Sequence, residues 1–415
     1  MLKLLGLILL LLPWVAFSQE AKKENPVSFY GFVRSEFYLD SYKGLNAFQD
    51  IFYLYPNYIG TDALGKDINE QMSANFVSVV TRGGVNIVGP EIFGAKTTGC
   101  IEVDFAGKPE IFLVRLRKAF TLFSWKNSKL LVGQTWHPFF SGDAFPKIAA
   151  LSTGTPMQPF NRSPQVRFDY KLGSLSLYGS ALYQQQYTSL GPIGGSNMYK
   201  RDAVIPETAF GFEYLRKAVT LGAGVDFNRI KPRVSTVGSD GKVYVTDECL
   251  NSTSWVGYGK YAKGKLMMLL KGYYGGNMSH LTMIGGYGVS GYNAQTGHET
   301  YTNISSYSTL FNITYGTKYR PGLLVGYLES LGSKDPLVPN KDGKADVWGW
   351  GTNIMDMFRI SPSISYSVPK FLLQAEYELT KANYGVGKFN FQDGLYADKH
   401  AAINHGVRVV MTYYY

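Results

Sequence analysis

Runs of about ten residues in which apolar and polar side chains alternate recur along almost the whole chain. In the last run, HGVRVVMTYYY, Val407, Val409 and Met411 fall on one face of an extended strand, while Arg408 and Thr412 fall on the other. A period of two residues is typical of a β-strand whose faces meet different surroundings. About ten residues is also the length at which a tilted strand crosses a lipid bilayer.

The apolar faces of these strands must be removed from water by contact with another apolar surface. Further alternating runs occupy 29–40, 101–105, 112–117, 219–227, 358–366 and 371–380. Nearly every run also has a polar face, yet no helical segment is available to cover the apolar one, and no later segment approaches 18 uninterrupted apolar residues. Closing the sheet into a cylinder, with lipid outside and water inside, resolves this. The aromatic content of 15% fits two interfacial girdles. A large secreted sandwich or β-helix is the alternative.

Both ends of the chain fit export to the outer membrane of a Gram-negative bacterium. Residues 1–18 read as a signal peptide, with Lys3 before an apolar run and Ala16-Phe17-Ser18 as the cleavage site. Residues 19–27 then form a short periplasmic segment, and 28–415 form a single transmembrane β-barrel domain. The aromatic strand ending at Tyr415 closes the cylinder against outer-membrane lipid, and we expect it to engage the barrel-assembly machinery.

Connection lengths predict the strand number. Short turns lie near 88–94, 124–128, 172–173, 216–217, 262–264, 317–320 and 367–369. Longer links lie near 41–73, 106–109, 138–164, 186–205, 229–251, 277–305, 330–354 and 381–402. Seven short turns and eight longer links indicate about 16 antiparallel strands, with short periplasmic turns and long external loops. A barrel of about 16 strands encloses an aqueous channel, whereas one of about eight is filled by its own side chains.

Side chains of both charges face the lumen by the alternation rule. The predicted pore-lining residues are Arg34, Glu36, Arg82, Glu102, Asp104, Arg115, Arg117, Arg167, Asp169, Arg359 and Arg408. Opposed charges in a narrow wet pore orient solutes and set ion preference. Arg34, Arg82, Arg115, Arg117 and Arg167 form the cluster that we expect to attract anions. The alternative is that arginines and acidic residues pair across neighbouring strands and stiffen the wall.

The link at 138–164 is too apolar for a solvated external loop. It follows Trp136 and His137 and contains Phe139, Phe140 and Asp143. Folding into the lumen would bury this loop and narrow the pore. A loop that packs over the rim or against a neighbouring subunit is the alternative.

Other chemistries have little support in the sequence. The five histidines are scattered without metal-ligand spacing, so no metal site and no cofactor are predicted. A hydrolase would need a Ser/His or Asp/His pair at matching depth, and no convincing partner is present. The charge of +10 is spread along the chain, which argues against nucleic-acid binding. Cys100 and Cys249 lie at opposite ends of the predicted barrel, so we expect no bridge between them.

The first half of the chain resembles the DcaP-like porins of Gram-negative outer membranes. The matching segments, which span about residues 30–170, are Gly31-Phe-Val-Arg-Ser-Glu, Ile101-Glu-Val-Asp-Phe105, Arg115-Leu-Arg-Lys-Ala-Phe120, Leu131-Val-Gly-Gln-Thr-Trp136 and Arg162-Ser-Pro-Gln-Val-Arg167. The N-terminal coiled-coil extension of that family is missing here. The resemblance implies a homotrimeric, 16-stranded porin with an arginine-rich constriction and a preference for small anionic solutes such as dicarboxylates.

The sequence therefore predicts a passive diffusion channel that is not an enzyme, with a lumen narrowed by the loop at 138–164. A barrel that its own loops close, and that acts as a surface adhesin or a lipid-active enzyme, is the alternative of a different class.

Overall fold

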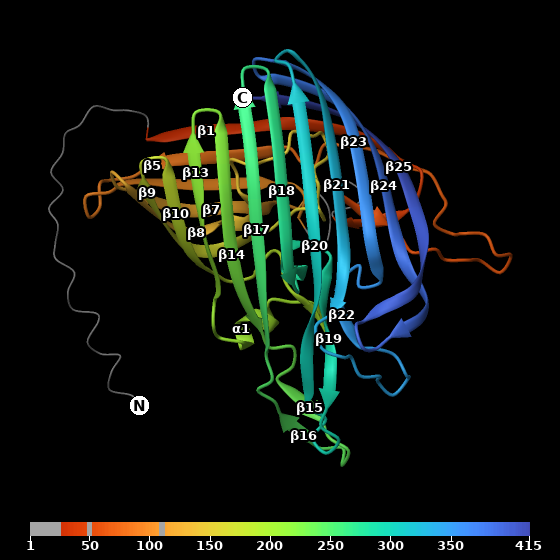
Figure 1. Cartoon of the computed structure of the whole chain (residues 1–415). Coiled ribbons are helices and arrows are strands. Elements are labelled where there is room, and N and C mark those ends of the chain that lie inside the picture. Colours follow the sequence, from red (N-terminus) through yellow and green to blue (C-terminus); the bar gives the residue numbers. More distant parts are fainter. Residues whose placement is uncertain (1–25, 48–51, 108–112) are drawn as a thin grey trace, which may run out of the picture.

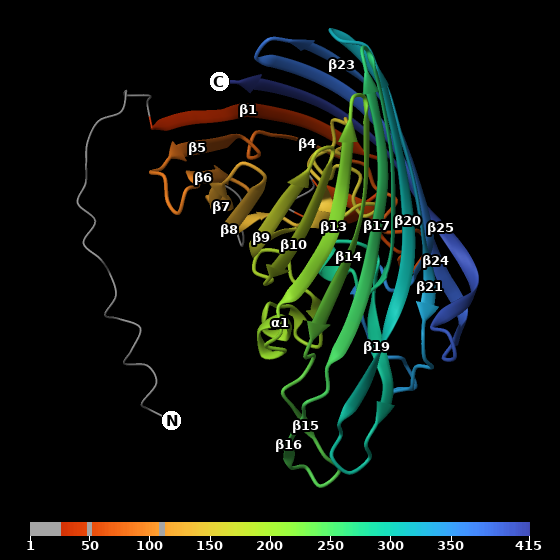
Figure 2. The same cartoon turned by 60° about the vertical axis from the view of Figure 1, so that its left-hand side comes forward.

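The chain forms one antiparallel sheet that closes on itself into a barrel (Figure 1; Figure 2). The structure is a computed structural model and describes residues 26–47, 52–107 and 113–415. Closure occurs where β1 (Val27–Asp40) pairs with β25 (Leu395–Tyr414), for example at Phe37 and Val409. The wall has 16 strands, which confirms the predicted architecture.

Strands follow one another around the wall as hairpins. Between β1 and β25 the wall consists of β4 (Ser73–Val77) with β5 (Arg82–Val88), β6 (Lys96–Asp104), β7 (Arg115–Ser124), β8 (Ser128–Trp136), β9 (Arg162–Leu172), β10 (Leu175–Leu182), β13 (Glu207–Arg216), β14 (Val219–Ile230), β17 (Leu250–Lys263), β18 (Leu266–Gly276), β20 (Glu299–Tyr315), β21 (Tyr319–Ser333), β23 (Ile354–Val368) and β24 (Phe371–Asn390). The segments β4 and β5 count as one wall strand because both pair with β1.

Smaller elements lie in the connections. They are β2 (Gly44–Ala47), β3 (Phe52–Pro56), β11 (Leu190–Gly191), β12 (Gly194–Gly195), β15 (Ser235–Val237), β16 (Val243–Val245), β19 (Gly285–Tyr292), β22 (Val347–Trp350), the helix α1 (Met198–Asp202) and the 3-10 turns η1 (Pro138–Phe140) and η2 (Ser279–Leu281). In the part of the chain that the structure describes, no helix has the length and apolar character to cross a membrane.

Side chains alternate between the two faces of the wall. On β25, Val407 and Val409 are each 40% exposed on the outside, whereas Arg408 and Val410 are 2% and 0% exposed inside. The outer face is therefore the apolar one, as a lipid-facing surface requires.

The short turns and the long connections lie at opposite ends of the barrel. Turns of the later hairpins and the C-terminus occupy the upper end of Figure 1, and the β15–β16 hairpin extends from the lower end. Two predicted loops are largely strand: β19 and the start of β20 lie within 277–305, and β24 and β25 run on through most of 381–402.

Two connections fold into the barrel. The β2–β3 hairpin belongs to the link at 41–73, and Phe52 and Leu54 on it are each 1% exposed. They pack in a cluster that includes Phe160 of the loop 138–164 and Leu324 and Met357 of the wall. The inner hairpin differs from the expectation of an external link. The predicted signal peptide and residues 19–25 lie outside the described residues, and β1 begins at Val27.

Candidate functional site in the lumen

Two carboxylates on β6 form ion pairs with several of the arginines that were predicted to line the pore. Asp104 accepts hydrogen bonds from Arg115 Nη2 at 2.6 Å and Arg117 Nη1 at 2.9 Å. Glu102 accepts from Arg117 Nε at 2.9 Å and Lys118 Nζ at 3.0 Å. A β-bulge in the pairing of β6 with β7 turns Arg117 and Lys118, neighbours in sequence, toward the same side.

Every other arginine predicted to line the pore also has a carboxylate close by. The N–O distances are 2.8 Å for Arg34–Glu36, 3.7 Å for Arg82–Glu102, 2.6 Å for Arg167–Asp169, 3.5 Å for Arg359–Glu378 and 3.8 Å for Arg408–Asp40. The structure thus places all seven of these arginines in ion pairs within the wall. A direct role toward a solute stays a prediction.

The arginines and Lys118 differ in their access to the lumen. The side chains of Arg167, Lys118 and Arg82 are 28%, 24% and 19% exposed. Those of Arg359 and Arg408 are 0% and 2% exposed. The first three side chains can meet a solute directly, whereas the last two are covered.

The loop 138–164 lies inside the barrel and is held there by side chains of the wall. Its Ala149 peptide accepts from Arg34 Nη2 at 2.7 Å and donates to Glu376 Oε2 at 2.6 Å. Lys271 Nζ donates to Phe140 O and Ala144 O, each at 3.1 Å. The buried polar groups of the wall thus satisfy the backbone of a loop that folds among them.

Arg359 joins both inner connections. Its Nη1 donates to Thr155 O of the loop at 2.9 Å, and its Nη2 donates to Leu54 O of the β2–β3 hairpin at 2.7 Å. Its Nε donates to Thr380 Oγ1 at 2.9 Å on the neighbouring strand. Arg359 therefore serves as an anchor for the loops, which the sequence analysis did not anticipate.

The predicted loop residues occupy two environments. The rings of Trp136 and Phe140 stack with centroids 3.8 Å apart, and Phe139 is 0% exposed. His137 is buried where β8 ends, and burial lowers the pKa of its imidazole below the usual value. Asp143 is exposed, and its backbone oxygen accepts from Lys260 Nζ at 2.6 Å.

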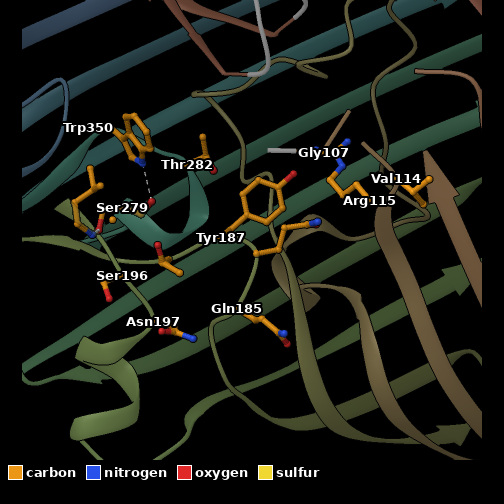
Figure 3. A pocket seen from close by; sticks show the side chains of 14 residues that line it. Gly107, Val114, Arg115, Gln185, Tyr187, Ser196, Asn197, Ser279, Thr282 and Trp350 are labelled. Atoms are coloured by element: carbon orange, nitrogen blue, oxygen red, sulfur yellow. Dashed lines mark hydrogen bonds between the residues drawn. The ribbon is translucent and has the colours of Figure 1, made fainter. Parts of the chain in front are cut away.

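A pocket of about 800 Å³ opens beside the arginine cluster. Arg115 and Trp350 lie at opposite ends of it, and Tyr187 lies between them (Figure 3). Hydroxyl and amide side chains supply most of the remaining lining. These are Gln185, Gln186, Thr188, Ser196, Asn197, Ser279 and Thr282. The pocket has room for a small polar solute.

Arg162 is a functional candidate that the sequence analysis missed. It is 0% exposed, with its guanidinium carbon 4.7 Å from the centroid of the Trp136 ring. It donates to Gln186 Oε1 at 3.0 Å and Tyr187 Oη at 2.9 Å, and no carboxylate of the described residues lies within ion-pair distance. Alternation from Arg167 assigns Arg162 to the outer face, but the rule fails where β9 emerges from the inward loop.

Comparisons with known proteins bear on the fold. No protein-family model matches this chain, and no curated protein matches its sequence. The outer-membrane channel DcaP of Acinetobacter baumannii matches with a TM-score of 0.66 and 20% identity, over 94% of this chain and 97% of that one. OmpT of Vibrio cholerae matches with a TM-score of 0.54 and 13% identity, over 95% and 100%. Salmonella typhi OmpF, solved with daunomycin, matches with a TM-score of 0.50 and 11% identity, over 94% and 97%.

These likenesses extend over nearly the full length of every chain compared. They therefore include the second half of this chain, where the sequence offered only alternation. The chain has the β-barrel fold of outer-membrane porins, and it resembles the channel DcaP.

Proposed function

We propose that this chain is an outer-membrane porin through which small hydrophilic, preferentially anionic solutes such as dicarboxylates diffuse. The single observation that carries the anion preference is the charge balance around the arginine cluster. It comprises the cations Arg34, Arg82, Arg115, Arg117, Lys118, Arg162 and Arg167 and the carboxylates Glu36, Glu102, Asp104 and Asp169. Within this set, seven cations against the four carboxylates that form ion pairs with them leave an excess of three positive charges.

A positive excess in a confined aqueous space lowers the energy of anions there and raises that of cations. The pocket beside Arg115 supports a path along this side of the lumen, because the opposite side is filled by the two inner connections. Its hydroxyl and amide lining offers hydrogen bonds to a hydrated solute. No catalysis is part of the proposal.

The proposed setting is the outer membrane of a Gram-negative bacterium. The apolar outer face supports contact with lipid, and the terminal strand ending at Tyr415, paired with β1, supports recognition by the barrel-assembly machinery. The proposed assembly is a homotrimer. Its support is the resemblance of the chain to OmpT of Vibrio cholerae, one structure of which is described as a trimer form, with a TM-score of 0.52.

One observation favours the second candidate, a barrel closed by its loops that acts as an adhesin or a lipid-active enzyme. Aromatic residues of both inner connections, including Phe52 and Phe160, pack against apolar inward residues of β20–β24. A closed barrel would carry no steady ionic current. Single-channel recording in a planar bilayer therefore separates the two candidates.

The charge argument is tested by the double variant Lys118→Glu/Arg167→Glu. Both side chains are partly exposed, so the new carboxylates remain hydrated. Four units of charge at about 10 Å in water raise the energy of a monovalent anion by about 1.7 kcal/mol and lower that of a cation by the same amount. The anion-to-cation permeability ratio should therefore fall by about two orders of magnitude at low salt, and less as salt screens the charges. The reversal potential across a salt gradient measures this ratio.

A matched control is Arg216→Glu/Lys263→Glu, which makes the same charge change at exposed strand ends outside the lumen. This control should leave the reversal potential unchanged. If both double variants shift it equally, or neither does, the arginine cluster does not set selectivity. Repeating the measurement with potassium salts of mono- and dicarboxylates compares the proposed solutes.

A further inference from the structure

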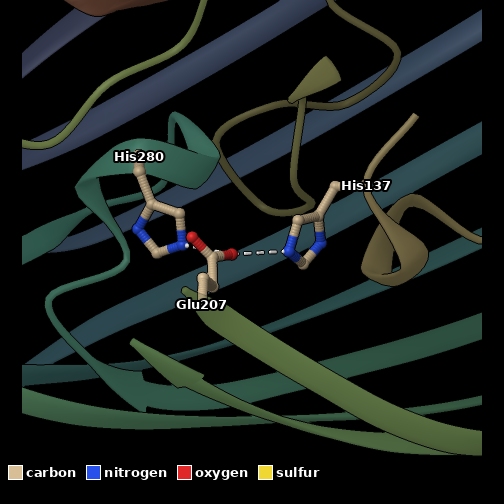
Figure 4. Close-up of side chains that lie close together, drawn as sticks. All are labelled: His137, Glu207 and His280. Carbon is tan, nitrogen blue, oxygen red and sulfur yellow. Dashed lines mark hydrogen bonds and ion pairs between the residues drawn. The ribbon is translucent and has the colours of Figure 1, made fainter. Parts of the chain in front are cut away.

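Two histidines from connecting segments and two carboxylates from wall strands meet on the inner side of the wall. His137 Nε2 lies 2.8 Å from Glu207 Oε1, and His280 Nε2 lies 3.2 Å from the same oxygen. Both rings point at the carboxylate between them (Figure 4). Asp226 Oδ1 lies 3.8 Å from His137 Nε2.

The cluster is closed to solvent. Each of these four residues is 1% exposed. Both oxygens of Asp226 lack a hydrogen-bond partner among the described residues. Two adjacent buried carboxylates are costly unless a cation or a proton compensates them. The buried ammonium of Lys200 interacts with both carboxylates, and a metal cation between the imidazoles would add to this compensation and give Asp226 a partner.

We propose that His137, Glu207, His280 and Asp226 bind a divalent transition-metal ion, with Zn²⁺ as the best fit. Imidazole nitrogens and carboxylate oxygens bind Zn²⁺ at about 2.0–2.1 Å, which places neighbouring ligand atoms of a tetrahedron about 3.3 Å apart. The ligand atoms of His137, Glu207 and His280 all lie within 4.8 Å of one another, and Asp226 Oδ1, 3.8 Å from His137 Nε2, would complete the set by moving toward them. A fully buried site with four protein ligands has the character of a structural zinc site.

The contacts of the two imidazole Nδ1 atoms define the alternative arrangement, in which no metal ion is bound. Phe139 N–H donates to His137 Nδ1 at 3.2 Å, and the Asn228 amide nitrogen lies 3.4 Å from His280 Nδ1. Lys200 Nζ donates to Asn228 Oδ1 at 3.0 Å, which fixes that amide. Without an ion, these contacts place the ring protons on Nε2, from which His137 donates to Glu207 Oε1, while His280 Nε2 lies 3.2 Å from the same oxygen. Ion binding must displace those protons and give up the Nδ1 contacts, which are longer than usual for hydrogen bonds.

An ion here would tie the loop 138–164 and the segment 277–284 to the wall. His137 begins the loop, His280 lies in η2, and Glu207 and Asp226 lie on β13 and β14. Ser279 and Thr282, which flank His280, line the pocket beside Arg115. The site would therefore hold one side of that pocket in place. The proposal does not depend on whether the barrel conducts.

The test uses full-length protein without an affinity tag, folded in detergent and passed over a chelating column after equilibration with Zn²⁺. Elemental analysis should find about one Zn²⁺ per chain, and X-ray absorption should show two imidazoles among its ligands. His137→Gln/His280→Gln should weaken Zn²⁺ binding at least tenfold. The control His298→Gln/His400→Gln removes two histidines outside the cluster and should leave binding unchanged.

Equal Zn²⁺ binding by the wild type and His137→Gln/His280→Gln would overturn the proposal and leave a metal-free clamp of two imidazoles on Glu207. Absence of two imidazole ligands from the wild-type X-ray absorption spectrum would overturn it equally. That second measurement decides the matter even if the double variant does not fold.

Discussion

Replacing residues 138–160 with an Asn-Gly turn is expected to raise the single-channel conductance several-fold. His137 N–H donates to Asn161 O at 3.0 Å, so β8 and β9 are still paired where the loop leaves them. A two-residue turn closes such a hairpin without moving the strands. Excision removes Phe140 and Phe160 from the apolar cluster inside the barrel and leaves water in their place.

The matched control removes an external hairpin of the same kind. Thr246 N–H donates to Val234 O at 3.1 Å, so residues 235–245 can also be replaced with Asn-Gly. This hairpin extends from the lower end of the barrel in Figure 1, and its loss should leave the conductance unchanged. Only barrels that show heat-dependent gel migration as folded protein are compared. Equal conductance of the loop excision and the wild type would mean that the loop does not limit passage.

The wall of the barrel was predictable because its rules are local. A strand turns successive side chains to opposite faces, so Arg408 and Val409 could be assigned to the inside and the outside from their positions alone. Turns carry similar local signals: Gly173, in the turn between β9 and β10, has φ +62°, a conformation that favours glycine. Strand number and order followed from these signals.

The folding of two connections into the lumen was not predictable from such local rules. The link at 41–73 contains the apolar run Phe52–Tyr55, yet the surface that covers it lies on strands more than 200 residues later. A signal was present on those strands, because the inward positions Leu310, Leu324 and Met357 are apolar. Apolar side chains that face inward must be shielded from water by other apolar groups. A lumen filled only with water does not provide such groups.

Alternation gave the direction of the charged side chains but not their partners. It placed Arg115 and Asp104 in the lumen, whereas their ion pair depends on strand register. The metal-ligand cluster escaped notice for a similar reason. His137, Glu207 and His280 are about 70 residues apart in succession, so no short motif connects them.

Replacing Arg359 with methionine is expected to lower the free energy of unfolding by about 3–5 kcal/mol, the usual cost of removing one partner of a buried ion pair. The variant leaves Glu378 without this cation, and it leaves Thr155 O and Leu54 O without their donor. Arg359→Lys keeps the charge, but a single ammonium cannot reproduce the fork of donors, so its loss should be smaller. Guanidinium unfolding in detergent micelles, followed by tryptophan fluorescence, measures the difference.

Variants of Arg359 also distinguish two roles of the inward arginines, which are anchoring the loops and contacting the solute. Arg216→Met removes an exposed arginine at the end of β13 and should change stability little, which makes it the matched control. If Arg359 anchors the loops, Arg359→Met destabilises the barrel while the reversal potential of the folded protein moves little, because the guanidinium is 0% exposed. A stable variant with altered ion selectivity would instead place Arg359 on the solute path. The burial of Arg359 and its hydrogen bonds to both inner connections favour the anchoring role. Neither water nor solute reaches the guanidinium, so it affects solute diffusion through the loops that it holds in place.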